Sequence, residues 1–117
     1  MTTFGEYIRG ARTVLQENDR SFSLRQVASR IGIEPAYLSK IERNEFAPPS
    51  EDVIRKLAQE LGENPDMLLA MAGKVSKELR EIVLKRPQLV GELLRNISEM
   101  PDHAILKIVR EVKDGEW

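Results

Sequence analysis

Apolar residues recur at helical spacing along nearly the whole chain. Spacings of three and four positions place such residues on one face of an α-helix, whereas a half-buried strand needs strict alternation of apolar and polar residues. No such alternation persists over five or six residues here. The pattern therefore predicts an all-α fold.

Capping residues and prolines divide residues 1–73 into five expected helices. Serine, asparagine and proline stand at expected helix starts and glycine at several expected ends, which matches the chemistry of helix caps. The first helix carries Ile8, Ala11, Val14 and Leu15 on one apolar stripe. The five helices are expected over about residues 4–16, 24–31, 35–44, 51–61 and 65–72.

A different pattern begins near Ser76, where the amphipathic segments become longer. Pro87 and Pro101 interrupt these segments, and proline disfavours the interior of a helix. We therefore expect three further helices. The chain divides into a domain over residues 1–73 and a helical C-terminal extension over residues 74–117.

Composition narrows the class of protein. Of the 117 residues, 41% are hydrophobic and 32% are charged, which suits one folded domain with a modest extension. The absence of cysteine excludes disulfide scaffolds and thiolate metal sites. No apolar run approaches the roughly 20 residues that span a bilayer, and the N-terminus lacks a secretory pattern. We expect a soluble, cytoplasmic protein that does not contact a membrane.

Catalysis finds little support in the residue types present. His103 is the single histidine, and the chain has neither a cysteine nor a glycine-rich phosphate loop. We expect no enzymatic activity, no catalytic residue, no cofactor and no bound metal.

The charged residues predict a local basic surface, although the molecule as a whole has almost no net charge. Eighteen basic and nineteen acidic residues give a formal net charge of −1, so no bulk positive field attracts nucleic acid. Residues 20–44 nevertheless have a balance of +3, from five bases and two acids. The bases are Arg20, Arg25, Arg30, Lys40 and Arg43, and the acids are Glu34 and Glu42.

The same segment has the layout of a helix-turn-helix. A short helix after Ser23, a turn at Gly32 and a second short helix from Pro35 follow one another, and glycine lets the two axes cross steeply. With Leu38 and Ile41 in the core, the second helix presents its polar positions outward. This geometry alone leaves two interpretations open, a helix that reads DNA and a helix pair that only packs.

These residues resemble the phage repressor and Cro-like (Xre) helix-turn-helix transcriptional regulators. The resemblance rests on Ser-Leu-Arg-Gln-Val-Ala from Ser23 and on Gly-Ile-Glu-Pro-Ala-Tyr-Leu-Ser-Lys-Ile-Glu-Arg from Gly32. The Pro-Pro-Ser start of the fourth helix and the Asn-Pro start of the fifth extend it over about the first 73 residues. It implies a five-helix repressor-like domain that binds double-stranded DNA.

The resemblance also implies roles for individual residues. Family members read base edges with the early part of the third helix, which is expected over about residues 35–44 here. They hold the DNA backbone with the start of the second helix and the end of the third. The base-reading positions are Pro35, Ala36, Tyr37, Ser39 and Lys40. The phosphate-contacting positions are Ser23, Leu24, Arg25, Arg43 and Asn44. Arg12 and Glu42 are implied to form a structural ion pair beneath the surface.

The chain departs from the family pattern at three places. Leu24 stands where the family often has glutamine, and the segment before Ser23 is several residues longer, with Arg20 as an additional candidate contact. Glu45 and Phe46 stand in a loop that is often basic. These departures predict fewer phosphate contacts and a moderate affinity for DNA.

The apolar stripes of the extension need a surface to cover them. A single helix-turn-helix reads few base pairs, whereas a two-fold dimer reads an inverted repeat. We therefore expect a homodimeric, sequence-specific DNA-binding regulator, a repressor on its operator. Two alternatives are an extension that folds back on the domain and an antitoxin-like or adaptor protein whose extension captures a partner protein. The interface residues are Leu89, Leu93, Ile97, Ile105, Ile108, Val109 and Val112.

Overall fold

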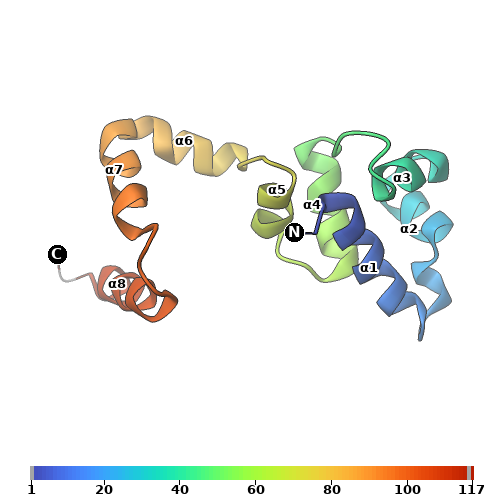
Figure 1. Ribbon diagram of the computed structural model, residues 1–117, viewed down its shortest axis with the longest axis horizontal. Helices are drawn as coiled ribbons and strands as arrows, with labels where there is room; N and C mark the ends of the chain where they lie inside the picture. Colours follow the sequence, from blue (N-terminus) through green and yellow to red (C-terminus); the bar gives the residue numbers. More distant parts are fainter. Residues whose placement is uncertain (1, 116) are drawn as a thin grey trace. The chain divides into compact units, whose positions relative to one another are not determined.

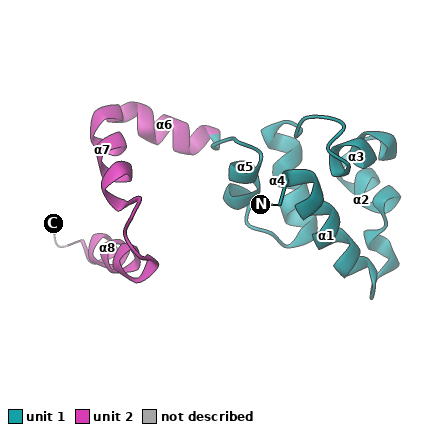
Figure 2. Cartoon of the chain, in the orientation of Figure 1, with its two compact units in different colours: residues 1–76 teal, residues 77–117 magenta. Residues whose placement is uncertain are grey.

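The computed structural model describes residues 2–115 and 117 and is helical throughout its regular structure, as the sequence predicts (Figure 1). The chain divides into two compact units, residues 1–76 and residues 77–117 (Figure 2). Among the described residues, no helix combines the length and the apolar content that a membrane crossing requires.

Most helices of the first unit begin and end where the capping residues predict, but the helix expected over about residues 35–44 ends at Glu42, and Asn44 lies beyond it with a left-handed φ of 61°. The side-chain oxygens of Ser23, Ser50 and Asn64 accept hydrogen bonds from backbone N–H groups in the first turn of the helix that follows each of them, which satisfies donors that have no partner inside the helix. The elements are α1 (Phe4–Gln16), η1 (Arg20–Phe22), α2 (Leu24–Ile31), α3 (Pro35–Glu42), α4 (Glu51–Leu61) and α5 (Pro65–Met71).

One apolar core joins these helices. Helix α1 packs against α3 and α4, α2 packs against α3 and α4, and α4 packs against α5. Burying a large aliphatic side chain contributes about 1.5–3 kcal/mol, so this shared core is what holds the short helices in place. Its largest fully buried side chains are Ile8, Val27, Leu38, Ile41, Ile54, Leu57, Leu68 and Leu69.

The buried face of α1 differs from the predicted stripe at one position. Val14 is 62% exposed, whereas Phe4, Ile8 and Arg12 are buried. Six residues separate Ile8 from Val14, which places Val14 about 120° around the helix from Ile8. Arg12 lies one turn after Ile8 and takes the interior position instead.

A close approach between α1 and α3 depends on Gly5. A Cβ atom at this position would collide with the backbone oxygen of Ile41 and would lie 2.9 Å from that of Glu42. Backbone oxygens of a packed helix cannot move aside as the tip of a flexible side chain can. The start of α1 therefore contacts the end of α3 through a site that has room only for glycine.

The first compact unit includes the residues that follow α5, as far as Ser76. The Nζ of Lys74 donates a hydrogen bond of 2.8 Å to the backbone oxygen of Pro49, and the side chain of Ser76 is buried. These contacts attach the residues after α5 to the first unit.

The second unit consists of three amphipathic helices, α6 (Lys77–Lys85), α7 (Pro87–Ile97) and α8 (Asp102–Asp114). Helix α6 contacts α7, and prolines stand just before or at the start of α7 and α8, as predicted. Among the described residues of this unit, none is buried. Its leucine and valine side chains remain largely open to water, notably Leu84, Leu89, Leu93, Leu94, Leu106 and Val112.

Candidate nucleic-acid interface

The turn between α2 and α3 sets the angle at which the two helices meet. Gly32 has a φ of 77°, in the left-handed region that glycine adopts without a steric penalty. The backbone N–H of Ile33 donates to the oxygen of Ala28 at 3.0 Å and closes the end of α2. Pro35 then begins α3. Since Leu38 and Ile41 are buried, the opposite side of α3 faces solvent.

The predicted base-reading residues lie on or beside this solvent-facing side of α3, and Tyr37 also packs against the apolar core. Ala36 is exposed, and Pro35, Tyr37, Ser39 and Lys40 are partly buried. Tyr37 and Lys40 are three residues apart and are therefore neighbours on the helix surface. The structure thus presents one small apolar side chain, two hydroxyl groups and one ammonium group on a single face.

At the start of α2, the predicted phosphate contacts have different environments. Ser23 caps the helix, and its Oγ accepts from the backbone N–H of Gln26 at 3.2 Å. Leu24 packs against the core, so it offers a phosphate only its backbone N–H. The side chain of Arg25 is exposed. A helix N-terminus with a nearby arginine suits an anionic oxygen.

At the end of α3, the predicted phosphate contacts already have partners within the protein. The Nε of Arg43 donates to the backbone oxygen of Ser39 at 3.3 Å, and Nη1 of Arg43 lies 3.3 Å from the carboxylate of Glu45. Asn44 has a φ of 61°, and its Nδ2 donates to Oγ1 of Thr3 at 2.9 Å. Arg43 must exchange an exposed ion pair to bind a phosphate, and Asn44 links α3 to the start of α1.

The structure brings Arg12 and Glu42 together beneath the interface. Two parallel hydrogen bonds of 2.8 and 2.9 Å join the guanidinium of Arg12 to the carboxylate of Glu42. Nη1 of Arg12 also donates to the side-chain oxygen of Gln16 and to the backbone oxygen of Phe22. Because Glu42 is neutralised in this way, α3 does not present its carboxylate to a phosphate.

The additional residues before α2 form a short turn that the sequence pattern did not predict. Asp19 accepts hydrogen bonds from the backbone N–H and the hydroxyl of Ser21, at 2.9 and 2.7 Å. The hydrogen bond from the Ser21 hydroxyl is the largest cause that lowers the pKa of Asp19 below its ordinary value, and the hydrogen bond from the Ser21 backbone N–H lowers it further. The turn, η1, leaves Arg20 exposed at the surface.

One basic residue of the segment 20–44, Arg30, has partners within the protein. Nε of Arg30 lies 2.7 Å from a carboxylate oxygen of Glu60 on α4, and the guanidinium carbon of Arg30 lies 5.3 Å from the centre of the Phe22 ring. Arg30 therefore connects α2 to η1 and α4. Because Arg43 also has an ion pair, with Glu45, the positive charge most accessible to a ligand comes from Arg20, Arg25 and Lys40.

The loop after α3 contributes an aromatic side chain that the sequence pattern does not predict at this surface. The ring of Phe46 lies 6.0 Å from that of Tyr37, at an interplanar angle of 51°. The Nζ of Lys40 lies 4.9 Å from the centre of the same ring. An aromatic residue directly after the predicted third helix is the only signal that the sequence carries for this arrangement.

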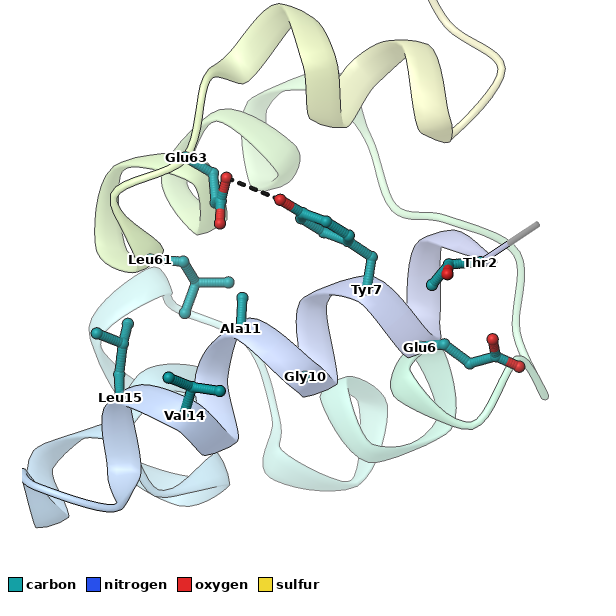
Figure 3. Close-up of a pocket in the computed structure, with 9 residues that line it drawn as sticks. All are labelled: Thr2, Glu6, Tyr7, Gly10, Ala11, Val14, Leu15, Leu61 and Glu63. Atoms are coloured by element: carbon teal, nitrogen blue, oxygen red, sulfur yellow. Dashed lines mark hydrogen bonds between the residues drawn. The ribbon is translucent and has the colours of Figure 1, made fainter.

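A groove of about 440 Å³ lies along α1, and none of its lining residues belongs to the predicted base-reading set. Figure 3 shows the phenol of Tyr7 directed toward Glu63, to which it donates a hydrogen bond of 3.0 Å. That hydrogen bond raises the pKa of Tyr7 above its ordinary value. Carboxylates among apolar side chains do not suit a phosphate. The lining residues are Thr2, Glu6, Tyr7, Gly10, Ala11, Val14, Leu15, Leu61 and Glu63.

Comparison with known proteins agrees with this geometry. Residues 18–74 match the family model described as a helix-turn-helix domain. The first unit is a helix-turn-helix domain. This confirms the family resemblance seen in the sequence and supports a DNA-binding regulator. The match begins before η1 and ends just after α5, so it includes α2, α3 and the turn between them.

A solved structure resembles this chain over nearly all of its length. A chain in a complex of the SinR protein with the SinI protein aligns with a TM-score of 0.50 at 21% identity, and the alignment covers 95% of each chain. This likeness extends beyond the helix-turn-helix domain into the helical extension and confirms the predicted fold class. No curated protein matches the chain significantly in sequence.

Proposed function

We propose that this protein is a sequence-specific, double-stranded DNA-binding transcriptional regulator that reads the major groove with α3. The observation that carries the proposal is the solvent-facing side of α3, which presents Tyr37 and Lys40 above a core that fixes the helix. An α-helix fits the major groove, where each base pair offers a distinct set of hydrogen-bonding groups. The family match over residues 18–74 supports the same function.

Base recognition rests on the N-terminal half of α3. The ammonium group of Lys40 can donate to O6 or N7 of guanine, and the methyl group of Ala36 can contact only the methyl group of thymine. The hydroxyl groups of Tyr37 and Ser39 can bind either a base or a phosphate. Pro35 begins the helix with a fixed φ and brings these side chains to the groove.

Phosphate binding rests on α2 and on the end of α3. The hydroxyl of Ser23, the backbone N–H of Leu24 and the guanidinium groups of Arg25 and Arg43 form the contacts to the DNA backbone, since the backbone N–H of Ser23 already donates to the oxygen of Arg20. Such contacts set the register of the protein on DNA and make affinity depend on salt. Because Arg43 exchanges its contact with Glu45 for a phosphate and Asn44 is tied to Thr3, we propose moderate affinity.

The second unit supplies the dimer. Its helices expose Leu89 (64%), Leu93 (52%) and Val112 (56%). A second copy can cover these faces, and the resulting dimer has two copies of α3 that can bind DNA. The structural neighbour was solved in complex with a second protein, which supports protein association by this fold. We propose a homodimer that binds an inverted repeat and represses by excluding other proteins from that DNA.

The function is tested by selecting bound duplexes from a random DNA pool at about 0.15 M salt. The full-length protein and its Lys40→Ala variant are run in parallel. We expect an inverted repeat to be enriched by the wild type and its guanine preference to be lost or relaxed in the variant. Arg55→Ala on α4 removes an exposed cation outside the interface and serves as the matched control. If the wild type enriches no sequence, the proposed function is wrong.

A further inference from the structure

The loop after α3 turns back onto the outer face of that helix. The backbone N–H groups of Glu45 and Phe46 both donate to the backbone oxygen of Lys40, at 2.9 and 3.3 Å. The turn carries the ring of Phe46 to a place beside the reading positions, where 48% of Phe46 remains exposed. A large apolar ring therefore lies at the edge of the proposed DNA interface.

Phe46 contacts the two longest side chains of the proposed base-reading set. Its ring packs at a tilt against Tyr37, and the ammonium group of Lys40 lies over its face at 4.9 Å from the centre. An aromatic face within about 6 Å attracts an ammonium group. A lysine side chain that is not restricted beforehand loses substantial rotamer freedom when its ammonium group binds a single acceptor atom on DNA. A ring that restricts Lys40 before DNA arrives reduces that loss.

An uncharged partner suits a residue that must later bind DNA. A carboxylate beside Lys40 would occupy its donors and would repel phosphate. The ring leaves the N–H groups of Lys40 able to donate to a base, because a cation–π contact uses the charge and not the donors. The nearby carboxylate of Glu45 is directed to Arg43 instead, at 3.3 Å.

We propose that Phe46 is a positioning residue for base recognition, whose ring holds Lys40 and Tyr37 in the orientation that reads the major groove. The inference rests on the proposed function and adds a determinant of specificity outside the reading helix. Because the ring carries no charge, its removal changes discrimination between sequences and leaves the electrostatic binding of random DNA unchanged.

The test compares Phe46→Ala, Phe46→Leu and Phe46→Tyr in the full-length protein, with affinities measured for the selected duplex and for a random duplex. We expect the ratio of the two affinities to fall about tenfold in the alanine and leucine variants. The tyrosine variant retains an aromatic face and keeps the ratio within about twofold. The salt dependence stays unchanged in all three. The double variant Phe46→Ala/Lys40→Ala discriminates no worse than Lys40→Ala.

A measurement on the protein without DNA separates this inference from the proposed function. We expect the ring current of Phe46 to shift the ε-proton resonances of Lys40 upfield in the wild type, since Nζ of Lys40 lies 4.9 Å from the ring centre. We expect Phe46→Leu to abolish this shift while the circular dichroism spectrum keeps its helical signal. Absence of the shift would show that Phe46 does not position Lys40. The same conclusion would follow if Phe46→Leu kept the wild-type ratio of affinities for the selected and random duplexes while Lys40→Ala lowered it. If the wild type selects no DNA sequence, the function and the inference both fail.

Discussion

Arg12 and Glu42 face each other across the interior of the helix-turn-helix domain, 30 residues apart in sequence and joined by two hydrogen bonds. Arg12 is 6% exposed and Glu42 is 4% exposed. The pair connects α1 to the last turn of α3. It fixes the position of α3 and removes a negative charge from beneath the proposed DNA interface.

Arg12→Met leaves the carboxylate of Glu42 buried without its partner. We expect this variant to lose about 3–5 kcal/mol of unfolding free energy, whereas Arg12→Met combined with Glu42→Leu loses much less than the sum of the two single changes. Urea denaturation of the four proteins measures the difference. Additive losses would contradict the prediction, since they would mean that the two side chains do not act as a pair.

Gly5→Ala introduces a methyl group that meets the backbone oxygens of α3. We expect a loss of about 1–3 kcal/mol, because these oxygens belong to a packed helix and overpacking has costs of this size. Gly10 is the matched control, since it lies in the same helix and a Cβ there meets nothing within 4 Å. Gly10→Ala is expected to stabilise the protein by about 0.5–1 kcal/mol. Thermal melting of both variants checks the opposite signs.

Arg25→Gln removes a proposed phosphate contact at the start of α2. We expect weaker binding of the selected and random duplexes by a similar factor, and a salt-dependence slope smaller by about 1. Lys56→Gln removes an equally charged, exposed side chain from α4 and is expected to leave the slope unchanged. Fluorescence titrations at several salt concentrations give both slopes. A selective loss for one sequence would assign Arg25 to base reading instead.

Leu89→Gln combined with Leu93→Gln makes an exposed face of α7 polar. We expect at least a hundredfold weaker self-association, because covering each leucine contributes about 1.5–3 kcal/mol. Sedimentation equilibrium of the full-length protein measures the change, and Glu92→Gln on the same helix serves as the control. A wild type that is monomeric at all concentrations would show that another surface or another protein covers these side chains.

The carboxylate of Asp19 reports on the turn before α2. Its pKa is below the ordinary value of 3.8, so the stabilisation is present above this value and is lost as the pH falls through the lower pKa of the folded state. Because the hydroxyl of Ser21 is the first cause of the shift, we expect Ser21→Ala to raise the pKa of Asp19 toward 3.8. A carboxyl-carbon NMR titration measures it. An unchanged value would exclude the hydroxyl as the cause.

Local chemistry explains why most helix boundaries were predictable. Ser23, Ser50 and Asn64 use their side chains to cap the helix that follows, and such caps act within three or four residues. Val14 was assigned to the wrong face because hydrophobicity alone does not say which of two possible stripes packs. In α1 the interior position belongs to Arg12, which enters the core only because Glu42 lies opposite.

Contacts between distant residues are not encoded in periodicity. Family resemblance, and no local pattern, suggested that Arg12 pairs with Glu42. The position of Phe46 depends on two N–H groups that converge on the backbone oxygen of Lys40, and irregular loops have no repeat from which such a turn is read. The conformation of Asn44 was equally unpredictable from local sequence. Its side chain donates to Thr3, and this hydrogen bond requires α1 and α3 to be packed together.

In the second unit, none of the described residues is buried, so the proposed homodimer would link the lifetime of the protein to its abundance. A unit without its own interior gains stability by mass action when another surface covers it. In the proposed homodimer, copies too dilute to associate would leave the apolar faces of α6–α8 uncovered. We therefore expect proteolysis to attack these helices faster in dilute protein than in concentrated protein. The exposed leucines would then make the survival of each copy depend on how many other copies surround it.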